Sequence, residues 1–136
     1  MTHPRRHAAA FLIAGFVLAV GTPVYVSRAA PHLAGYLMHP TLFLLQATPY
    51  VVCAVIWLPW RTRSAAISAL ALAGLLFLAS LMVYLPILLA PRKQGGDMIG
   101  LAYVLIAGAM TGGVLVGSAV AGMVLWLRAR VVRVRA

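Results

Sequence analysis

Side chains able to do chemistry inside a membrane are few in this sequence, and they gather on one apolar segment. Gln46, Tyr50, Cys53 and Trp57 follow one another at spacings of four, three and four residues. This spacing predicts four side chains on one face of a helix. Burying an amide and a phenol costs free energy unless both find hydrogen-bond partners. The face is therefore expected to point into a bundle of helices.

Two interpretations of this face stay open on the sequence. Ser80, Tyr84 and Tyr103 are expected to meet it from later segments, which gives an interhelical hydrogen-bond network. The alternative is an outer-leaflet pocket for a lipid, a quinone or another amphipathic ligand. That candidate pocket comprises Gln46, Tyr50, Tyr84 and Tyr103. No residue type in it discriminates among these ligands.

The four histidines, His3, His7, His32 and His39, all lie outside the long apolar segments. Haem held between membrane helices needs a histidine within a span, so no haem is predicted. His3 and His7 have a spacing that can hold a metal on a helix, but they flank a proline and two arginines near the start of the chain and are interpreted as solvated. His32 and His39, with Met38, have the ligand types of a copper site, and nothing in the sequence fixes their geometry. We therefore predict no metal and no cofactor.

A single acidic residue, Asp97, stands against 11 lysines and arginines. It directly precedes the fourth apolar segment, where a carboxylate stabilises a helix N-terminus as a cap. Proton- and sodium-coupled carriers rely on carboxylates within the membrane, and no apolar segment here has one. Catalysis by paired carboxylates is excluded for the same reason, and the single Cys53 fits neither a disulfide nor a zinc site. The sequence indicates a protein that is not an enzyme.

The composition places the chain in lipid. Of its 136 residues, 64% are hydrophobic and only 9% are charged, whereas soluble domains have about 25% charged residues. Four continuous apolar runs are long enough to cross the hydrocarbon as helices and contain no Asp, Glu, Lys, Arg or His. They are residues 8–26, 41–60, 65–90 and 98–127. The predicted fold class is an all-α polytopic membrane protein, an up-and-down bundle of four transmembrane helices in a single domain.

Short connections and the distribution of basic residues set the expected topology. Residues 61–64 and 91–97 are tight reversals that make successive spans antiparallel neighbours, and the connection 27–40 has room for a short interfacial helix from Pro31 to Met38. With the N-terminus inside, eight basic residues are cytoplasmic and three, Arg28, Arg92 and Lys93, are outside. We predict a multi-pass protein of the bacterial cytoplasmic (inner) membrane with both termini cytoplasmic. The alternative is that the first span is cleaved as a signal peptide, which would leave three spans.

Small residues recur along the fourth span. Gly113 and Gly117 stand between two alanines in a run with four-residue spacing, and another pair of glycines with this spacing lies on an adjacent side. In lipid, small residues mark the places where helices pack closely. The set predicts a helix-packing or subunit interface, against the first or third span of the same molecule or against another subunit. Its members are Gly108, Ala109, Gly112, Gly113, Gly117 and Ala121.

The sequence ends in a short basic tail, residues 128–136. Each arginine near an anionic leaflet contributes about 1 kcal/mol of binding, so anionic lipid headgroups are the expected partners of Arg128, Arg130, Arg133 and Arg135. Nucleic acid is not a predicted partner, because the tail has neither interleaved aromatic residues nor a fold to support it.

These observations predict a small, non-enzymatic integral membrane protein that packs through its fourth span against a larger membrane complex, as an accessory or assembly subunit. The alternative is a homo-oligomeric channel or carrier for an uncharged or lipid-like solute, gated near Pro49. A third hypothesis is a membrane enzyme or redox component that uses the outer tyrosines and histidines. The sequence names neither the partner nor the solute.

Overall fold

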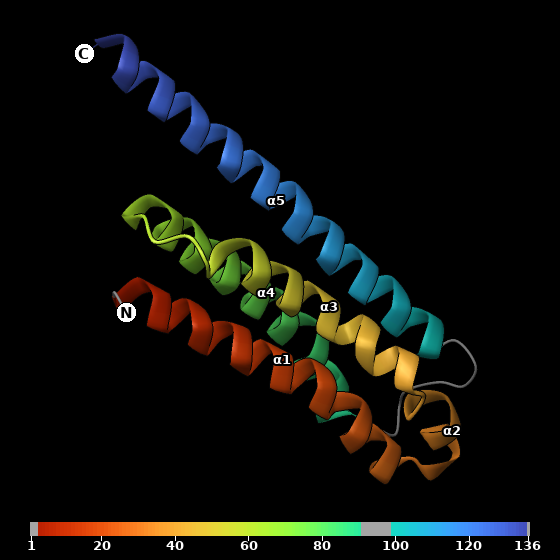
Figure 1. Cartoon of the computed structure of the whole chain (residues 1–136). Helices are drawn as coiled ribbons and strands as arrows, with labels where there is room; N and C mark the ends of the chain where they lie inside the picture. The colour runs from red at the N-terminus through yellow and green to blue at the C-terminus, as the bar shows by residue number, and fades with distance from the viewer. Residues whose placement is uncertain (1–2, 91–98, 136) are drawn as a thin grey trace.

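The computed structural model describes the backbone of residues 3–90 and 99–135, and the side chains of residues 3–90 and 101–134. Within these ranges the chain is almost entirely helical and has no strand. The elements, in chain order, are α1 (His3–Ala29), η1 (Pro31–Leu33), α2 (Ala34–Leu37), α3 (Pro40–Trp57), α4 (Arg63–Leu89) and α5 (Ile99–Arg135) (Figure 1).

The four long helices α1, α3, α4 and α5 are each long and apolar enough to span a membrane. Successive long helices run in opposite directions, and both chain termini lie at the same end of the bundle (Figure 1). We refer to this as the terminal end and to the opposite end, which carries η1 and α2, as the far end. The structure confirms the predicted all-α bundle and the class of a multi-pass membrane protein.

Local sequence explains where the middle helices begin and end. The hydroxyl oxygen of Thr62 accepts a hydrogen bond from the backbone N–H of Ala65 at 3.3 Å and so caps the first turn of α4. Pro40 occupies the first turn of α3, where its missing N–H costs nothing. Helix α3 ends at Trp57, short of the predicted boundary at residue 60, because Pro59 has no N–H to continue the helix.

The connection at the far end folds back onto the bundle. A short helix is predicted from Pro31 to Met38, and the structure has η1 and α2 over most of this range. Leu33 and Leu37 are fully buried, and both short elements contact α1, while α2 also contacts α5. The apolar side chains of this connection therefore close the far end of the bundle.

The long helices pack unevenly. Helix α1 makes its most extensive contact with α4, and α5 makes its most extensive contact with α3. Figure 1 shows α1, α3 and α4 grouped together, with α5 lying along α3. The buried face of α4 at the terminal end is a ridge of alanines at four-residue spacing, Ala65, Ala69 and Ala73. Such a ridge lets backbones approach closely, which is how helices gain contact energy in lipid.

Helix α5 is longer than a membrane crossing requires. Its 37 residues correspond to about 55 Å at 1.5 Å per residue, against a hydrocarbon core of about 30 Å. The predicted basic tail is therefore a continuation of the helix through Arg135, since its alanines, arginines and valines contain no glycine or proline to end it. The last turns extend beyond the other helices at the terminal end (Figure 1).

Candidate functional site

The polar face of α3 points into the bundle, as its spacing predicts. Gln46, Tyr50, Cys53 and Trp57 are all buried, with exposed fractions of 0% to 5%. The indole nitrogen of Trp57 donates a hydrogen bond to the hydroxyl of Ser118 on α5, with a donor to acceptor distance of 2.9 Å. Near the terminal end this bond joins α3 to α5, two helices that run in the same direction.

Tyr50 connects α3 to both α1 and α4. Its hydroxyl lies 2.5 Å from the hydroxyl of Ser80, and Ser80 donates to the backbone carbonyl of Leu76 at 2.7 Å. Because the single Ser80 proton serves that carbonyl, Tyr50 is the donor to Ser80. On the α1 side, a Cβ atom at Gly15 would lie 2.6 Å from Cε1 of Tyr50, so only glycine leaves room for the ring. Phe16 packs against the same ring edge to face, with centroids 6.3 Å apart.

One turn further toward the far end lie other polar side chains of α3, α4 and α5. Helices α3 and α4 are antiparallel and meet at Tyr50 and Ser80, so one helical turn along each brings Gln46 level with Tyr84. The Tyr84 ring stacks on that of Tyr103 of α5, with centroids 6.2 Å apart and an interplanar angle of 21°. We call Gln46, Tyr50, Ser80, Tyr84 and Tyr103 the polar core.

The polar core is closed. Its five side chains have exposed fractions of 0% to 3%, so the residues of the candidate pocket come together as packed side chains. Both polar atoms of the Gln46 amide and the hydroxyl of Tyr103 are buried without a hydrogen-bond partner among the described protein atoms.

The remaining candidate ligands are dispersed. His3, His7, His32 and His39 are exposed, and the Nδ1 atom of His39 is hydrogen-bonded to the hydroxyl of Thr41. In residues 3–90 and 99–135 no three side chains of His, Cys, Asp or Glu are grouped to hold a metal. The predicted cap Asp97 lies outside the described residues.

The small-residue set on α5, predicted as a helix-packing or subunit interface, is partly covered within the molecule. Gly108, Ala109, Gly112 and Gly113 are exposed, while Gly117 and Ala121 are half-buried. Only at Gly117 would a Cβ meet a neighbour, Leu72 of α4 at 2.7 Å; positions 108, 112 and 113 have no described neighbour within 4 Å.

The expected contact with the first or third span is present on the third, where Gly117 meets Leu72 of α4. The most extensive contact of α5, however, is with α3, the second span. Ser118 of α5 accepts the hydrogen bond from Trp57 of α3. The residues of α5 that are buried are Tyr103, Ala107 and Val114.

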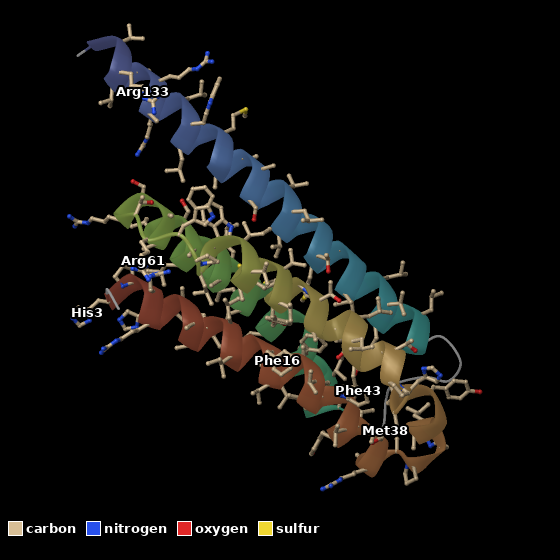
Figure 2. All side chains as sticks on the ribbon, viewed as in Figure 1. His3, Phe16, Met38, Phe43, Arg61 and Arg133 are labelled. Carbon is tan, nitrogen blue, oxygen red and sulfur yellow. The ribbon has the colours of Figure 1, made fainter. Side chains whose placement is uncertain are left out.

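Between α4 and α5 lies an apolar groove of about 480 Å³. It runs from Leu72 to Val83 on α4 and from Ile106 to Gly117 on α5, and Ala109 and Gly113 form part of its floor. We call Gly108, Ala109, Gly112 and Gly113 the bare face of α5. At the terminal end, Arg128, Arg130 and Arg133 are exposed, and Arg133 lies on the part of α5 that extends beyond the other helices (Figure 2). The guanidinium of Arg130 lies 4.0 Å from the centroid of the Trp126 ring.

Fold and site together define a small, all-α, multi-pass membrane protein with a closed polar core and one uncovered small-residue face. No family model, curated protein or solved structure matches the chain.

Proposed function

We propose that this protein is a non-enzymatic accessory or assembly subunit of a larger membrane complex, and that it binds its partner through the bare face of α5. The observation that carries the proposal is a contrast between glycines of α5. A Cβ atom at Gly117 would meet Leu72, whereas a Cβ atom at Gly112 or Gly113 would have no described atom within 4 Å.

Glycine within a helix costs about 1 kcal/mol of helix stability relative to alanine. Contact with lipid chains does not require a glycine and so does not offset this cost. In membranes, small residues on a helix surface are typical of sites where another backbone packs. Gly108 and Gly112 stand one turn apart, with Ala109 and Gly113 beside them, so a partner helix can approach the backbone of α5 over more than one turn.

Charge favours a different protein over a second copy as the occupant. Two copies joined through this face, with their axis along the membrane normal, would bring their terminal arginines side by side. Arg128, Arg130 and Arg133 would then repel one another, and residues 3–90 and 99–135 contain no Asp or Glu to offset them. A partner helix with acidic residues next to the terminal end of α5 would form ion pairs with these arginines.

The proposal includes the orientation. The excess of arginines at the terminal end puts both termini in the cytoplasm by the positive-inside rule, and anionic lipids of that leaflet are further partners of the exposed arginines. The bacterial inner membrane is the proposed location.

The test is purification from native membranes in a mild detergent, with mass determination of the intact particle. The proposal expects one different membrane protein at fixed stoichiometry, retained by a Gly21→Leu control and lost with Gly112→Leu. Gly21 is a suitable control because it is exposed on α1 with open space around it. A particle that contains only this chain contradicts the proposal and favours a homo-oligomeric channel or carrier instead.

A further inference from the structure

A row of apolar residues continues the bare face along the exposed side of α5. Starting from Ala109 and Gly113, apolar residues follow one another at spacings of four and three residues. These spacings keep them on one side of a single unbroken helix. We call the part of the row beyond the bare face the seam. Its members, all exposed, are Val116, Val120, Met123, Leu127, Val131 and Val134.

The seam extends past the other helices at the terminal end. Leu72 of α4 lies close to Gly117 of α5, and the two helices are antiparallel. Nine residues along each therefore bring Arg63, the first residue of α4, level with Trp126. Residues 127–135 continue α5 about 13 Å further at 1.5 Å per residue, and Figure 1 shows these last turns beyond the rest of the bundle.

The two outermost members of the seam lie beyond the hydrocarbon. Charged side chains such as Arg63 are costly within it, so the start of α4 marks its boundary at the terminal end. Contact with lipid chains accounts for exposed apolar residues before this boundary. It does not account for Val131 and Val134, which are 52% and 86% exposed. Single exposed valines are ordinary, but these two prolong a row that already has an apolar face, and burial against another apolar surface would stabilise them.

The membrane surface cannot cover this end of the seam. Residues 123–135 are helical throughout and contain no glycine or proline, the residue types at which helices usually bend sharply. The Arg130 guanidinium over the Trp126 ring, one turn away, stabilises the helix here. A straight continuation of a membrane-spanning helix leaves the bilayer along its own axis, so it does not lay Val131 and Val134 on the lipid.

The charges beside the seam indicate what covers it. Helical spacing places Arg128 on one side of the outer part of the seam, and Arg130 and Arg133 on the other; all three are exposed. Residues 3–90 and 99–135 contain no Asp or Glu to pair with them. Coiled coils use apolar residues at spacings of four and three for contact, and charged residues beside them to select the partner. A second copy would oppose arginine with arginine, whereas an acidic helix would form ion pairs.

We propose that the partner subunit contributes one long helix, which crosses the membrane against the bare face and continues beyond it along the seam. This helix carries acidic side chains beside Arg128, Arg130 and Arg133. The inference rests on the proposed function, which supplies the partner, and adds the form and the charge of the segment that binds. From Ala109 to Val134 the interface would be about 37 Å long.

Photo-crosslinking of the full chain in native membranes tests this inference. Three variants carry a diazirine analogue of leucine at position 120, 132 or 134, and mass spectrometry identifies the crosslinked peptides. Val120 and Val134 belong to the seam, within and beyond the lipid. Val132 is the matched control, because it is also an exposed valine, at 68%, but lies away from the seam on the helix.

The expected result is an adduct with the same different membrane protein from positions 120 and 134, several-fold weaker from position 132. The peptide captured at position 134 should contain Asp or Glu within one helical turn of the crosslink. An adduct at 120 without one at 134 would overturn this inference and leave the proposed function standing, as would equal yields from 132 and 134 or different proteins at 120 and 134. No protein adduct from either position, or adducts of this chain with itself, would overturn both.

Discussion

The indole nitrogen of Trp57 on α3 donates a hydrogen bond of 2.9 Å to the hydroxyl of Ser118 on α5. Sixty-one positions separate the two residues, and the bond fixes which turn of α5 faces which turn of α3. Once this pair is aligned, Gln46 lies level with Ala107, one turn from Tyr103. The alignment of the polar core thus depends on a contact several turns away.

Removal of this bond should weaken the attachment of α5. Interhelical hydrogen bonds in membranes contribute about 0.6 kcal/mol on average, and up to about 1.7. We expect Trp57→Phe and Ser118→Ala each to lower the free energy of unfolding by an amount in this range. Because both remove the same bond, the double variant should lose less than the sum of the two. Strictly additive losses in a denaturant titration would show that the bond contributes nothing.

Gly15 should tolerate no side chain, because Tyr50 occupies the space that its Cβ would need. Gly15→Ala is expected to destabilise the protein by about 1 to 3 kcal/mol, the usual cost of overpacking. The matched control is Gly21→Ala on the same helix, where nothing described lies within 4 Å and alanine should stabilise by up to about 1 kcal/mol. Equal thermal unfolding temperatures for the two variants would contradict the packing described here.

Two glycines of α5 that look equivalent in the sequence should behave differently. Gly117→Leu is expected to destabilise the isolated protein by about 1 to 3 kcal/mol, because Leu72 must be displaced. Gly113→Leu, facing open space within the molecule, should not destabilise the protein, and should stabilise it by up to about 1 kcal/mol because leucine favours a helix more than glycine does. Denaturant unfolding of the purified single chain measures both. A large loss of stability in Gly113→Leu but not in Gly117→Leu would show that residue 113 is packed within the molecule and does not belong to an uncovered face.

Thiol labelling tests the orientation. The variants are made in a Cys53→Ala background. His32→Cys should react with a membrane-impermeant maleimide in cells whose outer membrane has been permeabilised, because His32 is exposed at the far end. Arg133→Cys, exposed near the C-terminus, should react only after the membrane is broken. The opposite pattern would place both termini outside the cytoplasm.

Much of the fold is predictable because lipid imposes strict rules on a short chain. Uninterrupted apolar runs give the four long helices, and the spacing of Gln46, Tyr50, Cys53 and Trp57 gives the buried face of α3. Helix ends are less predictable from hydropathy, since the apolar run and the helix end for different reasons. Residues 128–135 leave the apolar pattern but remain helical, while Pro59 ends α3 inside its apolar run.

The packing partners are harder to predict, because small residues occur on more than one helix. The glycines of the fourth span stand out in the sequence, yet they remain largely uncovered. Ala65, Ala69 and Ala73 have the same four-residue spacing and are buried. Because alanine is common in this sequence, their spacing is harder to recognise. The role of Gly15 depends on which ring of another helix lies opposite, and no local pattern encodes that. The partner hydroxyl Ser118 is recognisable in the sequence only as a small residue.

Site-specific photo-crosslinking in native membranes identifies the molecule that lies against the bare face of α5. A diazirine analogue of leucine replaces Leu115, which is exposed one turn from Gly112 on the same side of α5, and a second variant carries a diazirine at the exposed Ile13 of α1. If a partner subunit covers the bare face, position 115 should give an adduct with one different membrane protein that is lost in Gly112→Leu, and position 13 should give lipid adducts alone. Lipid adducts alone from position 115, or an adduct of this chain with itself, would show that no such partner binds there.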